Sequence, residues 1–538
     1  MSLMKRKKFR VSQLFTLLLV AAFVVVTGAC EDDLGGTSSD IQDEGETVKN
    51  YLSGEDAISW GQLITPLTLG LTPGNDTTEI RLNWYSSGSP ADKTAQVRFI
   101  RGTRTEGTEL IEKTGEVAQA STGYSAHKVT VTGLTPGASY QYFISTDGTD
   151  WSPAYDFTAP AAGGVFKFAI IADPQLTEGT VDVNSRYPST STTTAAGWIE
   201  TMQKIAEANV SFIVSCGDQV DRSAGLEAEY TNFFAPTALR NLPLAPTSGN
   251  HDNHLHYNHH FNWPNTQVFG TETVETVAGR NYFYRYNNIL FVVLNTAPYP
   301  GSASAAMPYV QNFDATLTAA KAAHPVYDWL IVQHHKSTAS VGDHVADTDI
   351  QYYVEAGFER VMSEHNVDFV LAGHDHVYAR SYPLAGRDDG KVSVPDKSFS
   401  AVSGSTWASP NDPVYLTFTT GSGLKYYAVS SDDTFNYANT LYVKDNLAYP
   451  YLGEVTNANG DSSTNFGSSA YMNDGFLPVS NAAYVQPYIP SYAIVEVNGK
   501  TITFSTYPIA TVSGTSPGAA APHSFNANTP YDTITVTK

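Results

Sequence analysis

Histidines, acids and amides concentrate in the middle of this 538-residue chain, where twelve of the fourteen histidines lie between His251 and His376. They occur in short motifs, most of which follow a predicted apolar strand: Asp173-Pro-Gln175, Gly217-Asp218-Gln-Val-Asp221, Gly249-Asn250-His251-Asp252, His334-His335 and Gly373-His374-Asp-His376. Side chains at strand ends converge in the crevice beyond an open α/β sheet, where such sheets bind ligands. The motifs therefore predict one shared site.

The chemistry of these residues is that of metal ligands. Carboxylates, an amide oxygen and neutral imidazoles suit Mn, Fe or Zn, and a chain with only two cysteines offers few thiolates for a softer site. The candidate ligands are more than one ion can use: Asp173, Asp218, Asn250, His334, His374 and His376. Because a carboxylate can bridge two cations, we expect two metal ions.

The elements that must position these residues alternate between strands and helices from about residue 166. Apolar runs predict buried strands at 166–172, 212–215, 329–332 and 369–372, and helical spacing marks 195–208, 310–323 and 352–364. This alternation predicts an α/β domain with helices outside a central sheet. A strand at 414–420, a hairpin around Asn498-Gly499 and a last strand near 533–536 are also expected.

A region before this domain, 63–160, has short alternating segments separated by turn clusters, which predicts a small all-β sandwich. Its stretch Gly133-Leu-Thr-Pro-Gly137, followed by Tyr140, resembles the corner of a fibronectin type III domain. Trp84, Tyr140 and Trp151 are expected to pack in the core or at its edge.

The order and spacing of the polar motifs resemble the metallophosphoesterase signature, and Ala372-Gly-His-Asp-His-Val-Tyr378 is similar to its purple acid phosphatase form. The resemblance covers about 66–538, most closely 166–380. It implies a catalytic domain at 161–538, in which a β-sandwich is flanked by helices, with a long elaboration at 381–485. It also implies a metal-dependent phosphoric ester hydrolase that cleaves phosphomonoesters by attack of a hydroxide held at two metal ions, Fe, Mn or Zn.

The resemblance assigns a role to each ligand. Asp218 would bridge both metals, Asp173 and His376 would hold the first, and the second would be held by Asn250, His334 and His374. His251 would lie beside the leaving group and protonate it. His335 and His344 are the candidates for substrate contacts.

Two residues depart from the pattern of the family. Asp221 stands where purple acid phosphatases have the tyrosine that colours their iron, so no purple colour is expected. Gln175 stands where other metallophosphoesterases have a histidine ligand. Either Asp221 or Gln175 would complete the shell of the first metal.

The N-terminus has the layout of an export signal, with basic residues, an apolar run at about 14–26 and small residues up to Cys30. Cys30, followed by three acids, resembles the lipidation cysteine of a bacterial lipoprotein, although Thr27 departs from that pattern. We expect a signal peptide at 1–30, an acidic linker at 31–62 and a lipid anchor in the cell envelope, at the outer membrane or cell surface. A soluble secreted protein and an uncleaved anchor are the alternatives.

The charge balance limits the partners. With 31 basic against 53 acidic residues the net charge is -22, so the field of the protein repels nucleic acid, and no nucleic acid binding is expected. Bound cations would attract a small phosphorylated substrate. A phosphodiesterase or nucleotide pyrophosphatase, and a non-catalytic surface-binding lipoprotein, are the competing hypotheses. The sequence does not predict an oligomeric state.

The remaining candidates have structural explanations. His254, His256, His259 and His260 are expected in a polar loop at the rim of the pocket. Cys216 lies on a predicted buried strand and is expected to be a packed thiol. Trp198 is expected in the core.

Overall fold

The computed structural model describes residues 60–103, 109–121, 123–177, 196–222, 227–252, 254–268, 276–342, 344, 347–386, 394–423, 425–427, 442–444, 476–478, 481–485, 487, 489–511 and 525–538. The predicted signal peptide, nearly all of the linker and Cys30 lie outside these residues, as does much of the elaboration at 381–485. Among the helices of the described part, none is long and apolar enough to cross a membrane.

The N-terminal region is a sandwich of two four-stranded antiparallel sheets, β1-β2-β6-β5 and β4-β3-β7-β8. The strands are β1 Leu69–Pro73, β2 Ile80–Ser87, β3 Gln96–Arg101, β4 Glu109–Thr114, β5 Glu116–Gln119, β6 Tyr124–Val131, β7 Ser139–Ser145 and β8 Tyr155–Thr158, with a 3-10 turn at Pro90–Asp92. Alternate residues face inward and form the core, and Trp84, Tyr140 and Trp151 are buried as predicted. The small all-β domain is confirmed.

The larger domain contains two mixed sheets. The seven-stranded sheet has the order β11-β10-β9-β23-β24-β25-β18. Its strands are β9 Phe166–Ile171, β10 Ile213–Ser215, β11 Leu244–Pro246, β18 Ser405–Ala408, β23 Ser491–Asn498, β24 Thr501–Pro508 and β25 Asp532–Thr537. Strands β9, β10 and β11 are parallel, so their carboxyl ends meet at one edge of the sheet.

The second sheet has the order β12-β13-β14-β15-β19-β16-β17, and β22 also pairs with β16. Its strands are β12 Tyr282–Tyr286, β13 Ile289–Val293, β14 Trp329–Lys336, β15 Phe369–Gly373, β16 Tyr378–Ala385, β17 Val394–Pro395, β19 Val414–Thr417 and β22 Asn481–Val485. A short separate pair joins β20 Tyr442–Lys444 to β21 Phe476–Pro478. Strands β13, β14, β15 and β19 run parallel.

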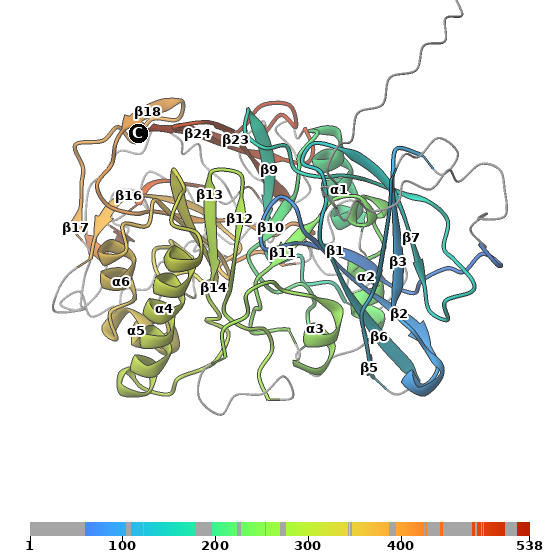
Figure 1. Cartoon of the computed structure of the whole chain (residues 1–538). Coiled ribbons are helices and arrows are strands. Elements are labelled where there is room, and N and C mark those ends of the chain that lie inside the picture. The colour runs from blue at the N-terminus through green and yellow to red at the C-terminus, as the bar shows by residue number, and fades with distance from the viewer. Residues whose placement is uncertain are drawn as a thin grey trace, which may run out of the picture. The chain divides into compact units, whose positions relative to one another are not determined.

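The two sheets pack face to face, and helices cover the second one. Phe369 of β15 meets Phe504 of β24 with ring centroids 4.6 Å apart, in a core shared by both sheets. On the other face of the second sheet, Leu290 and Val332 pack against helices α4 Ala303–Ala323, α5 Thr348–Glu355 and α6 Phe358–Glu364. Figure 1 shows these three helices side by side next to β13 and β14. The predicted sandwich flanked by helices is confirmed.

The remaining helices are α1 Ala196–Glu207, α2 Glu227–Phe233 and α3 His254–His260, with a 3-10 turn η2 at Thr237–Arg240. Trp198 of α1 is buried, as predicted. The single helix predicted at 352–364 is wrong, because Gly357 adopts a φ of 98° and separates α5 from α6.

Candidate metal centre

The polar motifs meet where the carboxyl ends of strands from both sheets converge. Asp173 and Asp218 follow β9 and β10 of the first sheet, while His335 lies near the end of β14 and His374 follows β15 in the second sheet. Ala172 and Thr420 form an isolated bridge beside them, which links the end of β9 to the segment after β19. The site therefore lies at the junction of the two sheets.

His335 is at the centre of the cluster. Its Nε2 atom lies 3.0 Å from Oδ1 of Asn250, 3.4 Å from Oδ1 of Asp218 and 3.2 Å from Nδ1 of His374. Ligand atoms of Asp218, His335 and His374 all lie within 4.8 Å of one another, and the three residues are buried. This spacing suits a shared metal ion.

Asp173 and His376 form the neighbouring part of the site. The backbone N–H of His374 donates to both carboxylate oxygens of Asp173, at 2.9 Å each. Nε2 of His376 lies 3.5 Å from Oδ1 of Asp173, and its Nδ1 pairs with the backbone carbonyl of Lys425 at 2.7 Å. Because Nδ1–H donates to that carbonyl, Nε2 of His376 is directed toward the cluster.

The structure reverses the positions expected for His334 and His335. Neighbouring residues on a strand face opposite sides of the sheet. His334 faces the helices, where its ring packs 4.8 Å from that of Phe358, and neither of its nitrogens has a hydrogen-bond partner among the described residues. The placement of His334 at the metal site is therefore wrong, and His335, expected to contact substrate, lies there instead.

Gln175 and Asp221 lie in different surroundings. Gln175 is buried and donates from Nε2 to Oδ2 of Asp218 at 2.9 Å, while its buried Oε1 accepts no hydrogen bond from the described residues. The side chain of Asp221 is 34% exposed, and its Oδ1 lies 3.9 Å from Nδ1 of His251. A buried oxygen that accepts no hydrogen bond is available to bind a metal ion. This geometry favours Gln175 over Asp221 as the residue that completes the shell of the first metal.

His251 lies at the open side of the cluster. Its backbone N–H donates to Oδ1 of Asp218 at 2.9 Å, and its Nδ1 makes a short hydrogen bond with the backbone carbonyl of Asp221. That bond leaves Nε2 on a ring that is 26% exposed and 4.0 Å from Oδ2 of Asp218. A proton on Nε2 would thus be accessible to a bound molecule.

His344 lies beside the cluster on a loop held by Asp375, a residue that the sequence interpretation left without a role. Oδ1 of Asp375 accepts the backbone N–H of His344 at 2.8 Å. The ring of His344 is 4.4 Å from that of His374, and its Nδ1 pairs with Asp347 at 2.7 Å. The loop thus brings His344 to the edge of the site.

The backbone at the site adopts a conformation that non-glycine residues seldom take. Among the described residues other than glycine, φ is positive at Asp173 (45°), Gln175 (42°), Asp218 (50°), His374 (73°) and His376 (49°), and otherwise only at four asparagines and one serine. Each such residue costs on the order of 1 kcal/mol and persists only where the surrounding structure enforces it. Strain concentrated on the candidate ligands is typical of a functional site.

Comparison with known families gives two matches, which cover the sandwich and the domain that carries the site. Residues 166–378 match the calcineurin-like phosphoesterase family, and residues 66–159 match the purple acid phosphatase N-terminal domain. This chain carries a calcineurin-like metallophosphoesterase domain. The sandwich that precedes this domain is a purple acid phosphatase N-terminal domain.

Individual relatives are distant. Uncharacterized proteins from two Mycobacterium tuberculosis strains, CDC 1551 and H37Rv, are each 22% identical over 345 residues, which are 58% of this chain and 61% of each relative. The chain thus spans about three fifths of their length. The solved structure of purple acid phosphatase PPD1 from yellow lupin seeds superposes with a TM-score of 0.55 at 15% identity, over 87% of this chain and 74% of that one. This likeness shows a shared fold.

The buried charges at the phosphoesterase site shift one another's pKa. Burial raises the pKa of the Asp218 carboxyl, but the charge and hydrogen bond of His335 outweigh burial and hold that pKa well below its usual range. Burial lowers the pKa of His335, but the charge of Asp218 outweighs burial and raises that pKa to about 9. Burial and the charge of His335 keep His374 neutral by lowering its pKa. A cation bound here would displace the proton of His335.

Two glycines let the phosphoesterase carboxylates approach the backbone closely. A Cβ atom on Gly249 would lie 2.0 Å from Oδ1 of Asp218, and one on Gly373 would lie 2.3 Å from Oδ2 of Asp173. Both glycines belong to the predicted motifs. Their role is to leave room for the candidate ligands.

The histidine-rich run after the site is a helix, so the loop predicted for it is wrong. In α3, His256 and His260 bind Glu227 through Nδ1 and Nε2, at 2.9 and 2.7 Å. His260 is fully buried and stacks on Tyr85 of β2, with ring centroids 4.0 Å apart. These histidines belong to the packing between the sandwich and the phosphoesterase domain.

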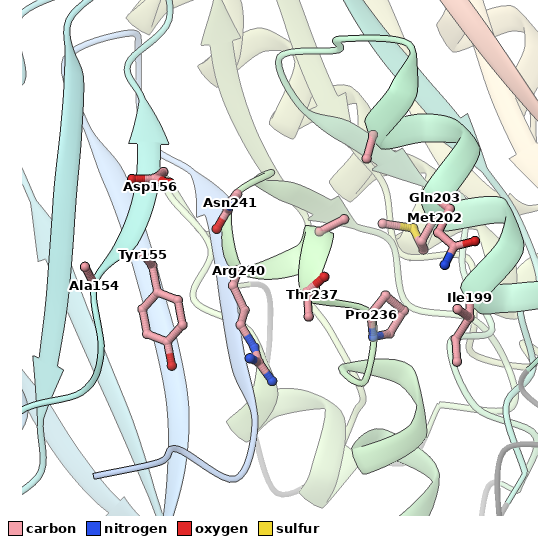
Figure 2. Close-up of a pocket in the computed structure, with 12 residues that line it drawn as sticks. Ala154, Tyr155, Asp156, Ile199, Met202, Gln203, Pro236, Thr237, Arg240 and Asn241 are labelled. Atoms are coloured by element: carbon pink, nitrogen blue, oxygen red, sulfur yellow. The ribbon is translucent and has the colours of Figure 1, made fainter. Parts of the chain in front are cut away.

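A separate cavity of about 430 Å³ lies between β8 and α1. Figure 2 shows Tyr155, Arg240 and Met202 among the side chains around it. Among the described residues that line this cavity, none is a candidate ligand.

Proposed function

We propose that this chain is a metal-dependent phosphoric ester hydrolase that uses two metal ions to hydrolyse phosphomonoesters. The observation that carries this proposal is the buried Asp218–His335–His374 cluster, whose ligand atoms lie within 4.8 Å of one another. Asp173, Asn250 and His376 surround it. Their nitrogen and oxygen donors suit Mn, Fe or Zn.

Each residue has a proposed role toward the metals. Asp218, whose two carboxylate oxygens lie near His335 and Gln175, would bridge the two ions. Asp173, His376 and Gln175 would hold the first, and Asn250, His335 and His374 the second. Bound there, two cations would activate a water molecule and neutralise phosphoryl oxygens.

The residues at the open side of the cluster would protonate the leaving group and contact the substrate. The hydrogen bond from Nδ1 of His251 to the carbonyl of Asp221 orients the ring. Nε2 of His251 is then positioned to give a proton to the leaving alkoxide, a step worth on the order of 10²- to 10⁴-fold in rate. His344, held by Asp375 and Asp347, would contact the substrate from the other side of His374.

The test combines metal analysis with a choice of substrates. The purified protein, expressed with Fe, Mn or Zn in the medium, should contain about two metal ions per chain. It should hydrolyse an aryl phosphate monoester faster than the matching diester. Protein free of metal after such expression would contradict the metal site, and a preference for the diester would contradict the substrate class.

We also propose that the protein is exported and anchored by a lipid on Cys30, on the strength of the basic, apolar and small-residue pattern before that cysteine. In a bacterial host, Cys30→Ala should move the protein from the membrane fraction to the soluble fraction. Unchanged fractionation would favour an uncleaved anchor instead.

A further inference from the structure

One segment far from every predicted motif lies against the metal site. Lys425 and Tyr427 belong to the elaboration that follows β19, roughly 50 residues after His376 in sequence. The backbone carbonyl of Lys425 is the partner of His376 Nδ1, at 2.7 Å. The segment therefore determines how a candidate ligand is oriented, and its next side chains lie at the site.

Tyr427 fills the space between two histidines of the site. Its ring centroid lies 4.6 Å from that of His376 and 4.6 Å from that of His344. The first ring belongs to the proposed metal ligands and the second to the proposed substrate contacts. Tyr427 is partly exposed, so it is not enclosed in the core.

The charges around Tyr427 indicate what it can bind. The carboxylate of Asp173 lies beside His376, and those of Asp218 and Asp221 lie beside His251. The ammonium of Lys425 lies 5.2 Å from the centre of the Tyr427 ring. A phenol can both donate and accept a hydrogen bond. Beside the candidate ligand His376 and the ammonium of Lys425, the Tyr427 hydroxyl could donate to an anionic oxygen of a bound phosphate.

We propose that Tyr427 is a substrate-binding residue whose hydroxyl donates a hydrogen bond to a phosphoryl oxygen of the bound monoester. This inference rests on the proposed function. In this inference, Tyr427 forms one wall of the substrate site, between His344 and His376. The segment that carries Tyr427 lies outside the motifs that resemble the family. A hydrogen bond to a charged group is typically worth about a tenfold change in affinity or more.

The competing explanation is that the ring only packs on the two histidines, and Tyr427→Phe separates the two roles. This variant keeps the ring and removes the hydroxyl. Inorganic phosphate is the probe, titrated by calorimetry into metal-loaded protein. We expect Tyr427→Phe to retain its metals, to weaken phosphate binding about tenfold and to raise KM for an aryl monoester more than it lowers kcat.

Tyr426→Phe is the matched control, since it removes a hydroxyl from the adjacent residue and should leave phosphate affinity unchanged. Phosphate affinity within about twofold of wild type in Tyr427→Phe would overturn the proposed contact. Metal-loaded wild-type protein that neither binds phosphate nor hydrolyses a monoester would overturn the proposed function together with this contact.

Discussion

This protein contains two clusters of histidines and carboxylates, one at the strand ends and one around Glu227. They differ in the backbone conformation of their residues and in the hydrogen bonds that their side chains make. At the strand ends, His335 and His374 face each other through nitrogens 3.2 Å apart, beside Asp218. Between the sandwich and α3, His256 and His260 each bind one oxygen of Glu227. Residue types are the same in both clusters, so composition alone does not distinguish them.

The difference is in the backbone and in the unpaired atoms. The strand-end cluster places five polar residues in positive φ and leaves Oε1 of Gln175 buried without a donor among the described residues. In the Glu227 cluster none of the described residues has positive φ, and His260 is stacked between Tyr85 and Tyr230, at 4.0 and 4.5 Å. Backbone strain concentrated on the candidate ligands therefore distinguishes the strand-end cluster from the Glu227 cluster, in which His256 and His260 are paired with a carboxylate.

The largest effect is expected from His335→Ala. Loss of the central imidazole should reduce metal content to one ion or fewer per chain. It should also lower kcat/KM for an aryl monoester by at least roughly 10³-fold, about 4 kcal/mol. His334→Ala is the matched control: it should retain both metals and most of the activity while lowering Tm, because it opens a space beside Phe358. Metal loss in His334→Ala but not in His335→Ala would reverse this assignment.

Much of the fold could be predicted from the sequence, and so could the motifs that meet at the candidate site, because strand-end motifs are local patterns. The buried strands at β9, β10, β14 and β15 could be predicted from their apolar runs. The sequence could not predict which of His334 and His335 faces the site. Strand β14 is apolar on both faces, so the alternation of side chains does not show which face points to the site. Tyr427 could not be found either, since only the tertiary fold brings it to His376.

The next effect tests which residue completes the shell of the first metal. Gln175→Ala should weaken metal binding by about 10- to 100-fold, whereas Asp221→Asn, at a partly exposed position, should change it less. Gln175→His should preserve or strengthen binding, because imidazole is a good ligand for the same ions. Both affinities can be measured by competition with a chelator. Stronger metal loss in Asp221→Asn would assign the ligand to Asp221. A purple iron-loaded protein would show that a tyrosine binds the iron, contrary to the prediction made from Asp221.

A smaller effect, on stability alone, is expected in the Glu227 cluster. Glu227→Ala leaves His256 and His260 without their carboxylate, and His260 is fully buried. Unfolding in urea should show a loss of about 1–3 kcal/mol, while metal content stays at the wild-type value. Glu227→Gln, which keeps an oxygen and the side-chain volume, should lose less. Loss of metals in Glu227→Ala would show that the two clusters are coupled.

The smallest effect is the pH dependence of that stability difference. Burial would raise the pKa of Glu227, but the imidazoles of His260 and His256 outweigh burial and lower that pKa to about 2. A carboxyl whose pKa is lower in the folded state stabilises the protein above its unfolded pKa, about 4.3, and loses that contribution as pH falls toward the folded value. Burial lowers the pKa of His260, so this imidazole is neutral at pH 7 and gains its charge only as the pH falls. The difference in unfolding free energy between wild type and Glu227→Gln should therefore be larger at pH 5 than at pH 3. A difference that is equal at both pH values would mean that the carboxylate charge of Glu227 contributes nothing to the pairing with His256 and His260.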